Sequence, residues 1–250
     1  SGFDNLMAVY GYAIQIYCDF SGYSDMAIGI SLLLGFRLPL NFNSPYVSLS
    51  ITEFWRRWHI SLSTWLKDYL YISLGGNRKG KIRTYINLLI TMLIGGLWHG
   101  AANKFIIWGA LHGAALAIHK AWLEYVPWAR SQNSKIYNFI AGLVTFHFVC
   151  FCWIYFRADD VPTVKTMLDR IFHNFSLTDM RIKISAYWKV FSFILAGYLL
   201  HFIPKRFKLN LEERFTLVPL VLKVVMVAVI IVLVYQVASS EVQPFIYFQF

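Results

Sequence analysis

The sequence predicts an all-α protein built as a multi-pass transmembrane helical bundle. Hydrophobic residues make up 58% of the chain and charged residues only 14%, whereas an average soluble domain has roughly 25% charged residues. The formal charge of +10 comes from short basic clusters between apolar runs, which is typical of cytoplasmic membrane loops. We therefore expect the chain to be surrounded by membrane lipid and to have no nucleic acid among its partners.

Two apolar runs, residues 6–18 and 26–36, open the chain, and a polar stretch from Asp19 to Asp25 lies between them. This stretch is too polar for the middle of a single lipid-facing helix, so we expect irregular backbone there, covered by protein or a wet cavity. Both carboxylates are expected to face inward, as helix caps or as part of a polar pocket. The capping role is favoured for Asp25, and the two roles are equally open for Asp19.

The next helix begins at Ser50-Ile51-Thr52-Glu53, which has the S-x-x-E form of a capping box. Apolar residues then recur at spacings of three and four from Trp55 to Tyr69, with basic residues between them. This pattern predicts a basic amphipathic or re-entrant helix with His59 on its apolar side. Residues 53–83 hold seven basic and two acidic side chains, an excess that predicts a cytoplasmic segment.

The apolar runs that follow cover residues 84–98, 105–122, 136–156, 187–203 and 215–238, and a segment of mixed charge at 157–186 is expected outside. Since about 20 residues cross the hydrocarbon core, His99 is expected about three-quarters of the way across. Gly109 and Gly113 form a small-xxx-small pattern that favours close helix packing. One membrane domain is expected over residues 1–250, as the C-terminal part of a longer chain.

The sequence contains none of the catalytic or nucleotide-binding motifs common in soluble enzymes: no G-x-S-x-G, H-E-x-x-H, P-loop or dinucleotide fingerprint. Histidines are the remaining candidates for chemistry. His112 and His119 lack acidic or thiol companions, so no metal site is expected. His147, between two phenylalanines, is interpreted as a satisfied core histidine.

His99 differs from the other histidines because glycines at positions 95, 96 and 100 surround it. Glycine permits close packing and bending of the backbone, so we expect the helix to break here and to open a cavity. A neutral imidazole can take a proton from a substrate hydroxyl, and such assistance is worth about 10²–10⁴ in rate. On these residues alone, a functional and a structural His99 are equally open.

Several segments form an ordered set of motifs: YCDFSGYSDMAIG at 17–29, FWRRWH at 54–59, GGNR at 75–78, WHGA at 98–101 and WGALHG at 108–113. In this order they resemble the membrane-bound O-acyltransferase family. The resemblance is greatest to its bacterial alginate O-acetylation branch, a relative of the teichoic-acid D-alanyltransferase. It covers most of residues 6–157, and the ending at 244–250 is also similar.

The resemblance implies that His99 matches the histidine regarded as catalytic in the family. His59 matches a second family histidine, on the cytoplasmic side of a central tunnel. Family members take an acyl group from a cytoplasmic thioester donor and deliver it across the membrane to a hydroxyl. For this chain the resemblance implies a bacterial inner membrane and an acetyl-CoA or acyl carrier protein donor, with no bound cofactor. The implied partners are a periplasmic acetyltransferase or polysaccharide-modifying proteins.

Further site residues are expected in two groups. A basic patch offers a landing place for an acidic carrier protein or for coenzyme phosphates, although positive loops are also normal for membrane topology. The residues expected to line the tunnel are Trp55, Trp58, Trp98, Asp19 and Asn103. The residues expected to dock the donor or its carrier are Arg56, Arg57, Lys67, Arg78 and Lys79.

Two other functions stay open on the sequence. A transporter or channel also uses broken helices and buried histidines, and inverted repeats or further embedded carboxylates would support it. The sequence shows no inverted repeat, and Asp19 and Asp25 are the only candidates for embedded carboxylates. A non-catalytic scaffold subunit of a polysaccharide secretion complex is compatible with the same sequence.

Overall fold

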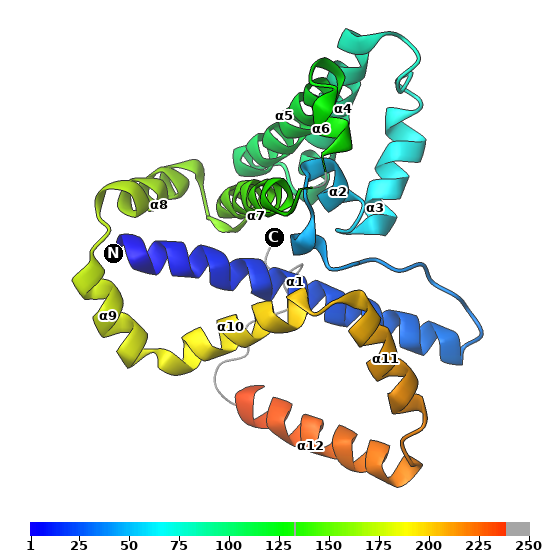
Figure 1. Ribbon diagram of the computed structural model, residues 1–250, viewed down its shortest axis with the longest axis vertical. Helices are drawn as coiled ribbons and strands as arrows, with labels where there is room; N and C mark the ends of the chain where they lie inside the picture. The colour runs from blue at the N-terminus through cyan, green and yellow to red at the C-terminus, as the bar shows by residue number, and fades with distance from the viewer. Residues whose placement is uncertain (133, 239–250) are drawn as a thin grey trace. The chain divides into compact units, whose positions relative to one another are not determined.

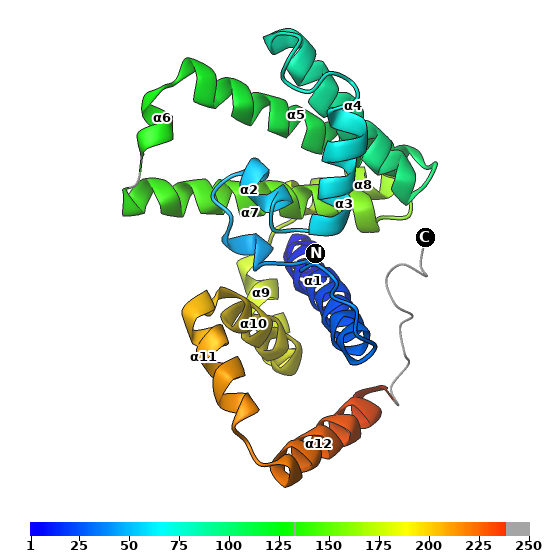
Figure 2. The ribbon, with the colours of Figure 1, turned by 90° about the vertical axis from the view of Figure 1, so that its right-hand side faces the viewer.

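Every regular element of the computed structural model is helical over the described residues, 1–132 and 134–238. No strand occurs in these ranges, so the all-α prediction is confirmed. The helices are shown from two directions in Figures 1 and 2. In chain order the elements are α1 (Gly2–Leu33), the 3-10 turn η1 (Pro45–Val47), α2 (Ile51–Trp55), α3 (Ile60–Trp65), the π-helical turn η2 (Leu66–Tyr71), α4 (Lys81–His99), α5 (Asn103–Tyr125), α6 (Trp128–Ser131), α7 (Lys135–Arg157), α8 (Val161–His173), α9 (Leu177–Ala186), α10 (Trp188–Phe202), α11 (Lys205–Thr216) and α12 (Leu220–Ala238).

Backbone contacts divide the chain into two units, Ser1–Tyr198 and Leu199–Phe250. Every residue of the candidate site lies in the first unit. The single domain expected over residues 1–250 stays a prediction, and the motif at 244–250 lies outside the described residues.

Helix α1 runs unbroken through the polar stretch where the sequence predicts irregular backbone. Asp19 is half-buried and Asp25 is exposed, and both lie inside the helix. The predicted break and the predicted capping roles are therefore wrong, as is the inward orientation of Asp25. Aspartate inside a helix costs only a fraction of a kcal/mol, roughly 0.7 kcal/mol or less relative to alanine, and the packing of α1 outweighs it.

Ser50 caps α2 as predicted. Its side chain accepts a hydrogen bond from the N–H of Glu53 at 3.2 Å, and the Glu53 carboxylate accepts one from the N–H of Leu49 at 2.9 Å. The predicted continuous amphipathic helix is wrong, because the chain breaks into α2, α3 and η2.

The break between α2 and α3 is centred on His59, which has φ 43° and ψ 54°. This left-handed conformation costs a residue other than glycine roughly 1–2 kcal/mol. A neighbouring loop stabilises it on both sides: the N–H of Asn43 donates to the Arg57 carbonyl at 2.9 Å, and the N–H of Ile60 donates to the Asn41 carbonyl at 3.0 Å. Strained backbone of this kind is concentrated at functional sites.

Helices α4 and α5 form a tightly packed hairpin (Figure 1). A Cβ on Gly109 would clash with the carbonyl oxygen of Met92, and a Cβ on Gly113 would lie 2.8 Å from the Cα of Leu89. The close approach predicted from the small-xxx-small pattern is therefore confirmed. Figure 2 shows α7 running beside α5, which it contacts.

Helix α4 continues through its two glycines and ends at His99, with Gly100 as its C-cap. The predicted helix break thus follows His99 instead of surrounding it. Gly96 is needed for packing, since a Cβ there would clash with the carbonyl oxygen of Phe105.

Among the described residues, α7 is the one helix long and apolar enough to cross a membrane. Helices α10 and α11 add a second only if the two together form a single span. Helices α4 and α5 interleave asparagine, histidine and lysine with their apolar residues, which lowers their mean hydropathy. The multi-pass bundle, its tunnel and its orientation stay predictions.

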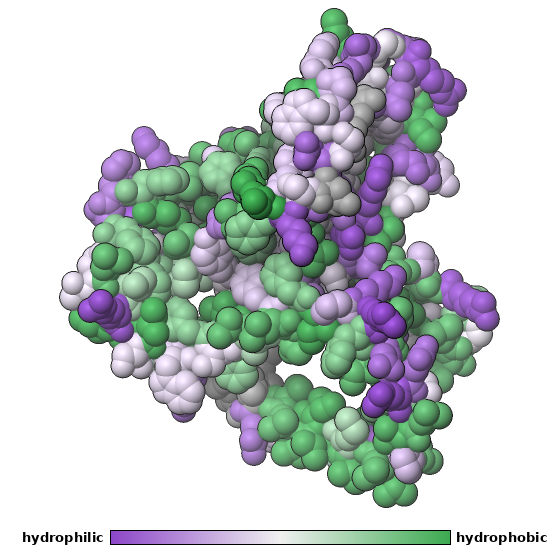
Figure 3. Space-filling model, in the orientation of Figure 1, coloured by the Kyte–Doolittle hydropathy of each residue, from purple (hydrophilic) through white to green (hydrophobic). Residues whose placement is uncertain are grey.

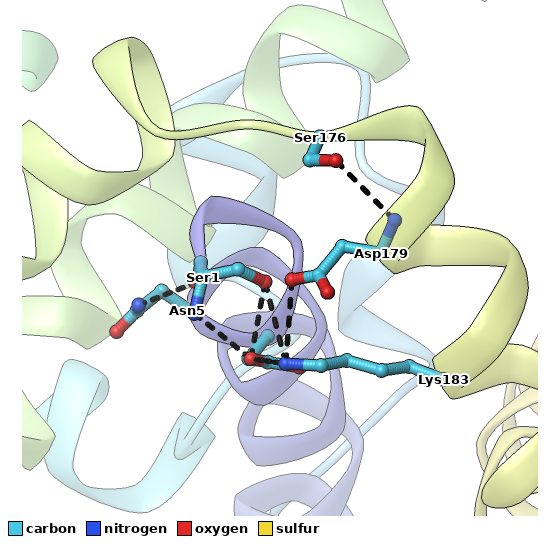
Figure 4. Close-up of polar contacts among 6 residues, drawn as sticks. Ser1, Asn5, Ser176, Asp179 and Lys183 are labelled. Carbon is cyan, nitrogen blue, oxygen red and sulfur yellow. Dashed lines mark hydrogen bonds and ion pairs between the residues drawn. The ribbon is translucent and has the colours of Figure 1, made fainter.

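An ion pair connects α9 to the first turn of α1, where Figure 4 shows the Lys183 side chain reaching toward Ser1. The Lys183 ammonium contacts the Asp4 carboxylate, and Asp179 lies 3.6 Å from the same ammonium. The hydrogen bond from Lys183 is the largest cause that lowers the pKa of Asp4, to about 2. Ser176 begins α9 by accepting a hydrogen bond from the N–H of Asp179.

In the second unit, α11 is rich in charged residues and α12 is almost entirely apolar. Most side chains of α12 are exposed, and its surface is hydrophobic in the face shown in Figure 3. The helix starts later than the predicted run at 215, because Phe215 and Thr216 complete α11.

Candidate functional site

His99 lies in an aromatic enclosure formed by three helices. Its ring centroid is 4.9 Å from that of Trp98, 5.2 Å from that of Trp108 on α5 and 5.0 Å from that of Phe156 on α7. All three contacts are edge-to-face, an arrangement that aromatic rings prefer. The surroundings of the imidazole are therefore predominantly apolar.

His59 approaches the same tryptophan from the break between α2 and α3. Its ring centroid is 6.3 Å from that of Trp98 and 4.7 Å from that of Phe20 on α1. The residue is only 9% exposed. The fold thus brings the two predicted catalytic histidines together around one indole.

The hydrogen bonds of His59 indicate which of its nitrogens is basic. Ser61 uses its single O–H on the Oδ1 atom of Asn41, at 2.9 Å, so its oxygen is left to accept from Nδ1–H of His59, at 3.3 Å. Nε2 then carries the lone pair. Burial lowers the pKa of His59 to about 4, so the ring is neutral at pH 7.

His112, considered from the sequence only as a metal ligand, lies beside His99 in the structure. It is fully buried, its ring centroid is 4.7 Å from that of Trp108, and the Nε1–H of Trp55 donates to its Nδ1 at 3.2 Å. The spacing of Trp108 and His112, one helical turn apart beside two glycines, is the sequence signal that identifies this position.

The predicted tunnel residues differ in how exposed they are. Trp55 and Trp58 are buried, and Trp98 is 57% exposed. Asp19 is half-buried within α1, and Asn103 is exposed at the start of α5. Their common role in a tunnel stays a prediction.

Two other histidines are satisfied by hydrogen bonds. His147 is exposed, so its predicted place in the core is wrong, but it is satisfied as predicted: Nδ1–H donates to the Leu143 carbonyl at 2.8 Å, and the Tyr10 hydroxyl donates to Nε2 at 3.0 Å. His119 contacts the Thr52 hydroxyl through Nδ1 at 2.8 Å.

A cavity of about 560 Å³ lies among α2, α3, η2, α4 and α5. Trp55 forms part of its wall, so one indole contacts both the cavity and His112. Three cationic side chains, those of Arg56, Lys67 and Lys120, also line it. Lys120 was not among the residues predicted to dock the donor, because it lies on α5, away from the basic segment.

The other predicted docking residues lie elsewhere. Arg57 is committed to Glu53, 2.7 Å away, and donates to the Asn43 carbonyl at 3.1 Å. Arg78 and Lys79 are exposed in the turn before α4. The structure therefore separates the predicted patch into cavity-lining, structural and surface positions.

Comparison with known proteins identifies the chain's relatives. A probable alginate O-acetylase AlgI of Pseudomonas syringae pv. tomato is 54% identical over 171 residues, which cover 68% of this chain and 32% of that protein. The peptidoglycan O-acetyltransferase of Helicobacter pylori is 50% identical over 162 residues, 65% of this chain and 30% of that protein. The teichoic acid D-alanyltransferase of Bacillus subtilis is 34% identical over 157 residues, 59% of this chain and 39% of that protein.

The chain spans about a third of the length of these relatives. The profile of the membrane-bound O-acyltransferase family matches residues 5–158, a range that includes His59, His99 and His112. This match covers more than half of the 250 residues and confirms the resemblance seen in the motifs. The chain therefore belongs to the membrane-bound O-acyltransferase family.

Proposed function

We propose that the full-length protein is an O-acyltransferase that moves an acetyl group from a cytoplasmic thioester to a hydroxyl. The acceptor is an exported polysaccharide or a partner protein that passes the acetyl group on. The observation that carries this proposal is the placement of His59 and His99 against the same indole, Trp98. The names of the alginate and peptidoglycan O-acetyl-transferring relatives support an acetyl donor and a cell-envelope polysaccharide.

In this proposal His99 is the general base. It takes the proton of the acceptor hydroxyl as the oxygen attacks the thioester carbonyl, a role worth about 10²–10⁴ in rate. The aromatic rings around it limit access of water, which protects a thioester from wasteful hydrolysis. His59, neutral and with Nε2 as its basic nitrogen, orients or activates the donor.

The cavity lined by Arg56, Lys67 and Lys120 receives the donor. Cationic side chains attract the phosphates of a coenzyme thioester or the acidic surface of an acyl carrier protein. Arg78 and Lys79, in the exposed turn, extend this surface for a carrier protein. The Arg57 guanidinium is paired with Glu53 and does not line the cavity, so in this proposal it contributes to donor docking less directly than Arg56 and Lys67.

The proposed setting is the bacterial inner membrane, with a multi-pass bundle around a tunnel. Donor and acceptor meet from opposite sides of the membrane near His99. The tunnel residues are Trp55, Trp58, Trp98, Asp19 and Asn103. A periplasmic acetyltransferase or polysaccharide-modifying protein completes the transfer.

The test is reconstitution of the full-length protein in liposomes with a labelled acetyl thioester outside and polysaccharide acceptor inside. Acetyl-CoA and an acetylated carrier protein are tried separately, each with and without periplasmic partner proteins. We expect label on the acceptor that depends on the protein. Absence of label with either donor and all partners contradicts the proposal and favours a transporter or a scaffold.

A further inference from the structure

The hydrogen bond to His112 determines where its proton lies. Trp55 Nε1–H donates to Nδ1 at 3.2 Å, and an indole nitrogen can only donate. Nδ1 therefore carries the lone pair, and the neutral ring has its proton on Nε2. That N–H is buried and has no hydrogen-bond partner among residues 1–132 and 134–238.

Trp108, one helical turn before His112, has a second buried N–H of this kind. Its side chain is 1% exposed, and Nε1 likewise lacks a partner within the described ranges. The two ring centroids are 4.7 Å apart, so the two donors lie on adjacent rings. A buried donor without an acceptor is costly, so a pair of them next to His99 requires an explanation.

The chemistry of the pair selects its ligand. Two N–H donors match an oxygen that has lone pairs and no hydrogen, and in the proposed reaction the acyl carbonyl oxygen is such an atom. A hydroxyl would need an additional acceptor for its own proton. The Trp108 ring is also 5.2 Å from the His99 ring, so this oxygen would lie beside the proposed base.

We propose that Nε2–H of His112 and Nε1–H of Trp108 bind the carbonyl oxygen of the acyl group and stabilise the negative charge that it acquires during transfer. This inference rests on the proposed acyltransferase function. As the acceptor oxygen bonds to the carbonyl carbon, His99 takes the hydroxyl proton and the carbonyl π electrons move onto the oxygen. When the carbonyl re-forms, the carbon–sulfur bond breaks and the thiolate leaves with the proton from His99.

Trp55 connects this donor pair to the proposed thioester cavity. Its indole lines the cavity of about 560 Å³, while its N–H fixes the proton of His112 on Nε2. In this proposal the acyl end of a donor bound in the cavity reaches His112 past the Trp55 side chain. Trp55 is a positioning residue in this arrangement, because it acts through His112.

Kinetics of the full-length enzyme provide the first test. We expect His112→Leu and Trp108→Phe each to lower kcat by about 10²–10³, the usual effect of removing one such donor, with little change in the KM for the thioester. His112→Gln keeps an N–H near the position of Nε2 and should retain more activity than His112→Leu. Trp153→Phe is the matched control: Trp153 is equally buried, but its N–H already donates to the Tyr46 hydroxyl at 3.2 Å, so kcat should not change.

Infrared spectroscopy provides a readout that a purely structural role would not alter. In the His99→Ala background, acetyl thioester labelled with ¹³C at the carbonyl is bound without rapid turnover. Hydrogen bonds lower the stretching frequency of a carbonyl. We therefore expect the frequency to be lowest in His99→Ala alone and to rise when Trp108→Phe or His112→Leu is added. Adding His112→Gln should give an intermediate frequency.

The outcomes separate the two proposals. The donor-pair assignment alone is overturned if the wild type transfers acetyl and two results hold for Trp108 and His112 variants whose melting temperatures show that they are folded. The variants keep the wild-type kcat, and adding them to His99→Ala leaves the carbonyl frequency unchanged. If a variant fails to fold, the remaining variants and the spectra decide. If the wild type neither binds a thioester nor transfers an acyl group, the proposed function is overturned together with this inference.

Discussion

Gly109 is a position where the α4–α5 hairpin tolerates no side chain, and Gly109→Ala tests how far the site depends on that packing. The added Cβ would clash with the Met92 carbonyl oxygen and lie 3.1 Å from the Cα of Leu93. Both obstacles are backbone atoms, so no rotamer change relieves them and the helices must separate.

The expected loss of stability follows from two opposing effects. Overpacking a tight interface costs typically about 1–3 kcal/mol, and the upper end applies here because the obstacles are backbone atoms. Alanine regains about 1 kcal/mol of helix propensity over glycine. We therefore expect a net loss of about 2 kcal/mol, measured as a lower melting temperature of the purified full-length protein in detergent.

Activity should fall as well, because Trp108 and His112 are carried by α5 and His99 by α4. A shift of about 1 Å in a reacting group can cost about 10²-fold in rate. Gly22→Ala and Gly29→Ala are the controls, since a Cβ at either position on α1 meets nothing within 4 Å. A Gly109→Ala protein that melts at or above the wild-type temperature and keeps full activity would refute the packing argument.

Three further predictions concern the region from Ser50 to Lys67. Ser50→Ala should destabilise the protein by about 1 kcal/mol through loss of the α2 cap, whereas Ser50→Thr should not; equal melting temperatures for the two variants would contradict this. Because burial lowers the pKa of His59 to about 4, from about 6.5 when unfolded, the unfolded state binds more protons between these values and stability falls as pH drops through that window. Between pH 6.5 and 4, the free energy of unfolding of His59→Gln should therefore fall by about 3 kcal/mol less than that of the wild type. If melting curves show the same fall for both proteins, the imidazole is not buried in its neutral form. Lys67→Glu should raise the KM for a coenzyme thioester about tenfold, equivalent to about 1.4 kcal/mol, while Lys165→Glu on α8 should leave it unchanged. If initial-rate measurements show the same KM for Lys67→Glu as for the wild type, the cavity does not bind the donor.

Features with local causes could be predicted from the sequence. The Ser50 cap depends on residues three apart, and the α4–α5 contact depends on small residues one turn apart, so both are visible in a short window. The α7 helix matches an uninterrupted apolar run. The all-helical class and the family followed from composition and from ordered motifs.

Features with long-range causes could not be predicted in the same way. The helical spacing of apolar residues continues through His59, yet the chain breaks there because a loop at 41–43 forms hydrogen bonds on both sides. Local pattern does not report such tertiary contacts. The polar stretch in α1 led to the opposite error. A break was predicted there, but the helix is continuous because its packing outweighs the small cost of the aspartates.

His112 illustrates the same limit at the candidate site. Its hydrogen-bond partner, Trp55, lies far away in the sequence, so no spacing rule connects them. Its neighbour Trp108 can be identified from the sequence, one helical turn earlier. That these two residues lie near His99 depends on the packing of α4 against α5, which the spacing does not predict. Considered alone, His112 could be judged only as a metal ligand.

The most direct test of the central claim compares acetyl transfer by full-length wild type, His99→Ala and His173→Ala under identical conditions. His173 is the control, because it is an exposed histidine on α8 that pairs with Asp169. If His99 is the general base, His99→Ala lowers the transfer rate by about 10²–10⁴ without loss of folding, and His173→Ala matches the wild type. An unchanged rate in folded His99→Ala would contradict the assignment of His99 as the base.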